Sequence, residues 1–128
     1  MGDSMSLIKS NNITNVAGGI PTVKGQQLIP TAWVNWNGTG TIAIRDSENI
    51  SSITDVSTGK TRLNFTTTMA NTNYVGFINF QRTITWSQQG AEVRHSDKST
   101  TSVDALTREG SNNVDEPEVH VVILGGQA

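Results

Sequence analysis

The chain has 128 residues, a net charge of −2, 34% hydrophobic residues and 16% charged residues. This length predicts one domain, and the acidic balance argues against a nucleic-acid-binding protein, which normally carries a basic surplus. Cysteine is absent, which excludes disulfides, thiol catalysis and cysteine-ligated zinc and favours folding in the reducing cytoplasm. Threonine, serine, asparagine and glycine are abundant instead, as is typical of short strands joined by turns.

Residues 1–30 show no hydrophobic period and are interrupted by Gly18-Gly19, Pro21, Gly25 and Pro30. Such punctuation predicts an extended N-terminal arm, with residues 31–128 as the body. The arm still contains scattered aliphatic side chains, more than a disordered tail usually has. Two interpretations remain open: a loosely packed terminus, or an arm that becomes ordered against a partner subunit or another docking surface.

The first residues lack the basic and apolar regions of a signal peptide. Met1 to Ser6 do match the short pattern for N-myristoylation, although Met5 is an equally good start, with four residues placed before it. No apolar run approaches the length of a membrane span, about 18 residues. We therefore expect no membrane partner.

Short strand-like runs recur about every ten residues from Thr31 onward. The run 32–36 ends at Asn37-Gly38, the strongest short signal for a hairpin, and residues 57–60 predict a second turn. Residues 88–117 are mostly polar and give the weakest signal, and no window shows a helical stripe. We predict an all-β fold with an antiparallel β-sandwich or jelly-roll-like body. The expected strands cover residues 32–36, 41–45, 50–53, 61–67, 74–80, 83–87 and 119–124.

Two of these runs, Tyr74–Phe80 and Val119–Leu124, are apolar on both faces. In an antiparallel sandwich one face of a strand normally meets water and carries polar side chains. The second apolar face therefore needs a cover, which subunit association would supply. The alternative is that arm residues fold back over it. We expect a homo-oligomer, with three copies as the preferred number.

Trp33 and Trp36 lie three residues apart on the first body strand, so they must point to opposite faces. Trp36 shares its face with Ala32 and Val34 and is the expected core residue. Trp33 shares its face with Thr31 and Asn35 and is expected nearer to solvent or a subunit contact.

Residues with catalytic chemistry are sparse. His95-Ser96-Asp97 contains the letters of a hydrolytic triad, but a triad is assembled from distant segments, so a polar turn is expected there. His120 lies in an apolar strand and is expected to be structural. The carboxylates of 46–48 and 115–118 do not match a calcium loop. We expect no catalytic residues, no cofactor and no metal site.

Aromatic side chains could instead form a sugar-stacking face, although aromatics at strand spacing more often belong to the core. The candidates for such a face are Trp33, Trp36, Phe77, Phe80 and Trp86.

Residues 32–40 read A-W-V-N-W-N-G-T-G, followed by I-R-D-S at 44–47 and N-I-S-S-I-T-D at 49–55. A strand that ends N-F-T-T at 64–67 and a start N-Y-V at 73–75 complete the pattern. This succession resembles a module of bacteriophage virion proteins, found in small tail-fibre-like and appendage proteins of marine and cyanobacterial phages. The resemblance covers the central third strongly and residues 119–125 weakly, and it does not extend to the arm. Trp36 stands where Phe is usual, and Lys60-Thr61 where an acidic-aromatic pair is common.

The resemblance implies a non-enzymatic structural protein of the virion, assembled in the host cytoplasm. It would form a trimeric β-rich knob of a tail fibre or surface appendage in contact with the host, with the arm bound to other virion proteins. A capsid decoration (cement) protein that stabilises the head is one alternative. A carbohydrate-binding module for host surface glycans is another. A polysaccharide depolymerase is the least expected function, because glycosidases need paired carboxylates and depolymerases need a much longer scaffold than this chain.

Overall fold

The computed structural model describes residues 9–14, 16–17, 22–23, 26–27, 29–81 and 89–127. Strands dominate this part of the chain, and the one helical element in it is a short 3-10 turn. The elements are β1 (Thr22–Val23), β2 (Gln26–Gln27), β3 (Ala32–Asn37), β4 (Ala43–Glu48), β5 (Ile50–Ser57), β6 (Lys60–Phe65), β7 (Val75–Phe80), β8 (Gln89–Val93), η1 (His95–Asp97), β9 (Ser102–Glu109), β10 (Asn112–Asn113) and β11 (Val119–Leu124).

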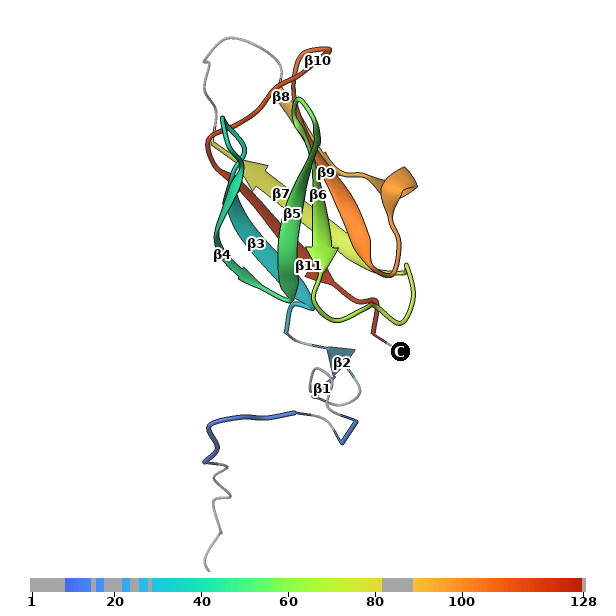
Figure 1. The fold of residues 1–128 in the computed structure, drawn as a ribbon. Coiled ribbons are helices and arrows are strands. Elements are labelled where there is room, and N and C mark those ends of the chain that lie inside the picture. The colour runs from blue at the N-terminus through green and yellow to red at the C-terminus, as the bar shows by residue number, and fades with distance from the viewer. Residues whose placement is uncertain are drawn as a thin grey trace, which may run out of the picture.

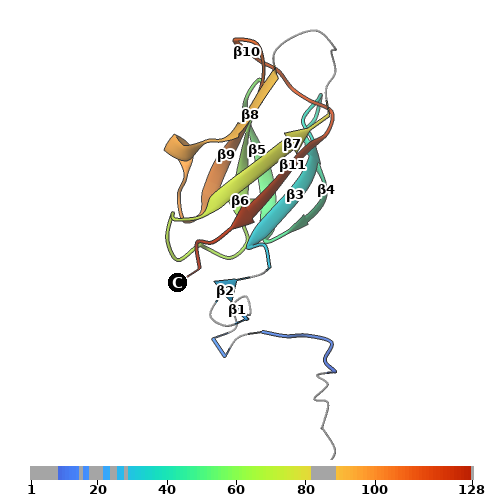
Figure 2. The same cartoon turned by 180° about the vertical axis from the view of Figure 1, so that it is seen from behind.

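Two antiparallel sheets pack face to face (Figures 1 and 2). The first sheet has the strand order β4-β3-β11-β7, and the second has the order β5-β6-β9, with β8 and β10 also paired to β9. Figure 1 is viewed from the side of the second sheet and Figure 2 from the side of the first. β1 and β2 pair only with each other among the described strands. The two sheets confirm the predicted all-β sandwich.

The core lies between the two sheets and follows from alternation along the strands. In β3, Ala32, Val34 and Trp36 are buried, whereas Trp33 and Asn35 point to the other face. β11 alternates in the same way. The buried apolar side chains that form this core are Ala32, Val34, Trp36, Ile50, Leu63, Phe65, Met69, Tyr74, Val103, Ala105, Val119, Val121 and Ile123.

Asn49 forms the corner where the chain passes from β4 in the first sheet to β5 in the second. Its φ of 57° lies in the left-handed region, which Asn tolerates better than most residues. Its Nδ2 donates to the carbonyl oxygen of Thr31 at 3.2 Å, and its Oδ1 accepts from the N–H of Thr67 at 2.7 Å. The side chain thereby ties the corner to the start of β3 and to the segment after β6.

The connection after Asn37 is longer than the two-residue hairpin that the Asn-Gly signal suggests. β3 and β4 do pair, but residues 38–42 separate them. Asn37 Oδ1 accepts from the N–H and the hydroxyl of Thr39, at 3.1 and 2.7 Å, and Gly40 adopts a φ of +61°. Gly38 is needed for space, since a Cβ there would lie 2.8 Å from the carbonyl oxygen of Glu116.

The second predicted turn is confirmed at Thr58-Gly59, between the paired strands β5 and β6. Gly59 has a φ of +70°, and a Cβ on it would lie 2.6 Å from the carbonyl oxygen of Thr107. Its N–H donates to Asp115 Oδ1 at 2.6 Å, and its carbonyl accepts from Thr107 N–H at 2.9 Å. This turn is therefore packed against the segment that leads into β11.

β9 is the central strand of the second sheet, yet it lies in the stretch that gives the weakest sequence signal. Residues 103–107 are all buried. Val103 and Ala105 face the core, whereas Asp104 lies on the outward face and is still completely covered. Buried polar positions, Asp104 and Thr107, break the apolar alternation that strand prediction depends on.

Two predictions fall partly or wholly outside the described residues. The expected strand at 83–87, with Ile84 and Trp86, is one of them. The arm over residues 1–30 is the other, and the boundary at residue 30 stays a prediction.

Candidate interaction surface

An apolar row crosses the outward face of the first sheet. The strand register places Trp33 of β3 beside Val122 of β11, and Val122 beside Phe77 of β7. Phe77 is 62% exposed, Val122 37%, and Val75, on the same face of β7, 52%; Trp33 is half-buried. The face that had been expected to need a cover is therefore open in the single chain. Contiguous exposed apolar side chains commonly mark interaction sites.

A polar row lies directly beside the apolar one. Asn35 of β3 is in register with His120 of β11, and His120 with Asn79 of β7. His120 Nε2 lies 2.8 Å from Glu118 Oε1, so the imidazole has a carboxylate partner on the outward face. This row therefore offers amide, imidazole and carboxylate groups on the outward face of the first sheet.

The charge of Glu118 is stabilised within this polar row. Its hydrogen bond with His120 holds the pKa of the Glu118 carboxyl below its usual value, and the nearby positive charge of Arg45 acts in the same direction. Arg45 of β4 is itself fixed, because its guanidinium donates to the carbonyl oxygens of Trp36 at 3.1 Å and Pro117 at 2.7 Å. Main-chain contacts thus hold the positive charge of Arg45 beside the polar row.

The two predicted carboxylate groups do not converge on a cation site. Asp115 accepts from the Gly59 main chain, Glu116 is buried and Glu118 joins the polar row. Asp46 and Glu48 lie on β4, in register with the outward side chains of β3. No three His, Cys, Asp or Glu side chains come together as a metal site in the described part of the chain.

The His95-Ser96-Asp97 segment forms the 3-10 turn η1, consistent with the expected polar turn. Asp97 Oδ2 lies 3.0 Å from Lys60 Nζ and 2.8 Å from Arg94 Nε. The hydrogen bond with Lys60 is the main cause that holds the pKa of the Asp97 carboxyl below its usual value. Asp97 is therefore part of an ion-pair network with Lys60 and Arg94.

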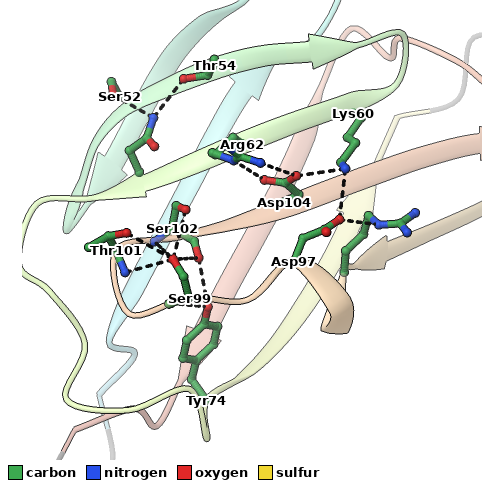
Figure 3. A network of polar contacts seen from close by, with 12 residues as sticks. Ser52, Thr54, Lys60, Arg62, Tyr74, Asp97, Ser99, Thr101, Ser102 and Asp104 are labelled. Carbon is green, nitrogen blue, oxygen red and sulfur yellow. Dashed lines mark hydrogen bonds and ion pairs between the residues drawn. The ribbon is translucent and has the colours of Figure 1, made fainter.

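Asp104 is the centre of that network, which Figure 3 shows on the outward face of the second sheet. Its Oδ1 accepts from Arg62 Nε at 2.7 Å, and its Oδ2 lies 3.1 Å from both Arg62 Nη2 and Lys60 Nζ. Hydrogen bonds with Asp97 and then with Asp104 raise the pKa of Lys60, and the hydrogen bonds with Asp104 raise the pKa of Arg62. A buried carboxylate with two cationic partners is charge-compensated, so we interpret this cluster as structural.

Tyr74 anchors the loop between η1 and β9. Its hydroxyl donates toward the carbonyl oxygens of Ser99 at 3.0 Å and Ser102 at 3.3 Å (Figure 3). Its ring packs edge-on against Phe65 with centroids 5.7 Å apart, and Lys98 Nζ lies 4.9 Å from its centroid. Burial raises the pKa of the Tyr74 hydroxyl to about 12, so it stays protonated as a donor.

The aromatic candidates divide between core and surface. Trp36 is 2% exposed and belongs to the core, and Phe80 packs partly buried against it. Trp33 and Phe77 are the outward pair, and Trp86 lies outside the described residues. Sequence reasoning missed the contribution of Asn35, Asn79 and Arg45, because strand order and register bring them together.

The cavities of the protein are poorer candidates for a binding site than this outward face. The cavity between Trp36 and Glu116 has a volume of about 10 Å³, about the size of one water molecule. A hollow over β8 and β9, lined by Leu106 and Arg108 among others, measures about 120 Å³, well below the roughly 300–1,000 Å³ of small-molecule sites. The outward face of the first sheet is therefore the better candidate site.

Comparison with protein-family models, with curated proteins and with solved structures gave no match. Within the described residues, no helix is long and apolar enough to cross a membrane.

Proposed function

We propose that this chain is a non-enzymatic structural protein of a phage virion. Its β-sandwich forms a trimeric knob of a tail fibre or surface appendage, and residues 1–30 attach it to other virion proteins. The observation that carries the proposal is the open apolar row of Trp33, Val122 and Phe77. A flat sheet face with exposed aromatic and β-branched side chains supports association through a second protein surface.

The particle itself tests this proposal. Gold-labelled antibodies raised against the purified chain should bind virus particles at a fibre or appendage in electron micrographs. A low-resolution density map of the particle should show a three-fold knob at the same place. Density over the contacts between capsomers would instead identify a head decoration protein. Particles that carry no label at all would overturn the proposal.

The arm has its own test in the same system. Removing residues 1–29 should leave the sandwich folded, because its core lies within residues 32–123, but should abolish incorporation into particles. A circular-dichroism spectrum of the truncated protein checks the fold. A truncated protein that still incorporates normally would show that the arm is not the attachment.

Glycan binding is the second candidate, and one observation favours it. Trp33 and Phe77 lie on the same face, separated by one strand, and amide side chains that can bind hydroxyl groups stand in the next row. Affinity electrophoresis in gels that contain host surface polysaccharide tests it. Glycan binding would be favoured over self-association if the wild-type protein is retarded, Phe77→Ala abolishes the retardation, and Val56→Ala on the other sheet does not change it.

A further inference from the structure

The outward face of the first sheet has an order of side chains that is nearly the same in both directions across its strands. From β3 through β11 to β7, one row reads Trp33, Val122, Phe77. The next row reads Asn35, His120, Asn79 over the same strands. Each row therefore has like groups at its two ends and a single residue of β11 at its centre.

This order makes the face complementary to itself. Consider a rotation axis that is parallel to β11 and lies in front of the face. Rotation about it places the β3 side of one copy against the β7 side of the next. It then brings Trp33 against Phe77 of the neighbouring copy, a pairing of aromatic rings. It also brings Asn35 against Asn79, and two primary amides can each donate and accept a hydrogen bond. Contacts of this kind are what association of identical chains requires.

Other directions of packing fit less well. An axis across the strands, between the two rows, would place the aromatic side chains over the asparagines and leave polar groups without suitable partners. An axis along β11 also keeps the carboxylates of β4 at the margin, whereas Glu118 and His120, which are hydrogen-bonded to each other, lie near the axis. Asp46 and Glu48 lie on β4 at one edge of the sheet, so they extend beyond the overlapping rows and remain in water.

We propose that the partner of this face is a second copy of the chain, placed so that Trp33 of one copy contacts Phe77 of the next and β11 lies nearest to the axis. This inference rests on the proposed function, because it names the contact by which the copies associate. It holds for an axis that relates two copies or three, since both arrangements bring the β3 side against the β7 side.

Cysteine cross-linking tests the contact, and the chain has no cysteine of its own to interfere. Asn35→Cys and Asn79→Cys remove the amides of the polar row but leave Trp33, Val122 and Phe77 in place, and light scattering of each variant checks that it still associates. A short bismaleimide is the suitable reagent, because facing sheets lie about 10 Å apart and a disulfide spans Cα separations only up to about 7 Å. Thr54→Cys, exposed on the second sheet, is the matched control.

Mixing the Asn35→Cys and Asn79→Cys proteins should give cross-linked chains, whereas each protein alone should give few or none. Thr54→Cys should give none in any mixture. If Asn35→Cys alone gives as high a yield of cross-linked chains as the mixture, the proposed arrangement is overturned. The absence of links in the mixture, from a protein that light scattering shows to be oligomeric, would also overturn it.

The double variant Asn35→Cys/Asn79→Cys tests the contact between copies and the number of copies separately. Cross-linked chains that run as trimers on a denaturing gel would support the contact and the trimeric knob together. Cross-linked pairs would support the contact and overturn the trimer. A monomer that gives no links would overturn both.

Discussion

Trp33 and Trp36 lie three residues apart on β3 and point to opposite sides of the first sheet. Trp36 is 2% exposed and packs between the two sheets. Trp33 is in register with Val122 on the outward face. One strand therefore contributes a core residue and a surface residue of the same type, and substitutions at the two positions should have different consequences.

Trp36→Ala should destabilise the fold by about 3–5 kcal/mol, because it leaves a large cavity in the core. This is a large part of the total stability of a domain, about 5–15 kcal/mol, so unfolding or aggregation is expected. Trp33→Ala should keep the fold and weaken association. Thermal melts and size-exclusion profiles of both variants give the comparison. Equal destabilisation by the two substitutions would contradict the difference in their burial.

Asp104→Asn should destabilise the fold by about 1–3 kcal/mol, since it removes the charge from hydrogen bonds with Arg62 and Lys60 at a completely buried position. Glu92→Gln is the matched control, because that carboxylate also has two cationic partners, Arg94 and Arg108, but is about half exposed. The control should change stability by less than about 0.5 kcal/mol. Urea unfolding of both variants measures the difference. A control that loses as much as Asp104→Asn would show that burial of the pair is unimportant.

Stability should fall in acid, partly through Glu118. Its carboxyl pKa is lowered in the folded state from the ordinary value of 4.5, mainly by the hydrogen bond with His120. A carboxyl group whose pKa is lower in the folded state than in the unfolded state stabilises the fold at pH values above its unfolded-state pKa. This contribution is lost as the pH falls through its folded-state pKa. The melting temperature of Glu118→Gln should therefore lie below that of the wild type near neutral pH and approach it below about pH 4.5. A difference that stays constant through this range would refute the role of the pair.

Gly59→Ala should destabilise the protein more than Gly40→Ala. Both residues have a positive φ, which costs about 1–2 kcal/mol for alanine. At Gly59 the new Cβ would also meet main-chain atoms at 2.6–2.9 Å, whereas at Gly40 nothing lies within 4 Å. Gly90→Ala, in an open place without positive φ, is the control for the loss of glycine itself. Equal unfolding midpoints for the Gly59 and Gly40 variants would show that the β5–β6 turn can move away.

Three strands of the first sheet, β3, β7 and β11, were predictable because their residues alternate or are continuously apolar. β4 was predicted at 41–45 but covers Ala43–Glu48, and its last residues, 46–48, are polar and gave no strand signal. β3 and β11 show this directly, and the outward position of Trp33 followed from strand geometry alone. β9 was not predictable, because Asp104 is polar in sequence and becomes compatible with burial only through Lys60 and Arg62 of the neighbouring strand. Burial of a charge depends on partners that come together in the fold, and a single-sequence pattern does not contain them.

The interaction surface was predictable in part for the same reason. Two-faced apolarity in 74–80 and 119–124 indicated that a face would remain open. Which residues meet on that face depends on the order β3-β11-β7 and on the register that aligns Trp33, Val122 and Phe77. Strand order and register involve residues distant in sequence, so the symmetric order of the two rows became visible only in the fold.

The mass of the purified protein in solution tests self-association through the outward face most directly. Multi-angle light scattering at micromolar concentration should give three times the chain mass of 13.8 kDa. Phe77→Ser, which removes the most exposed aromatic side chain of the apolar row, should shift the protein toward monomer, and Val56→Ser on the other sheet should leave the trimer unchanged. A monodisperse wild-type monomer at the same concentration would contradict the proposal.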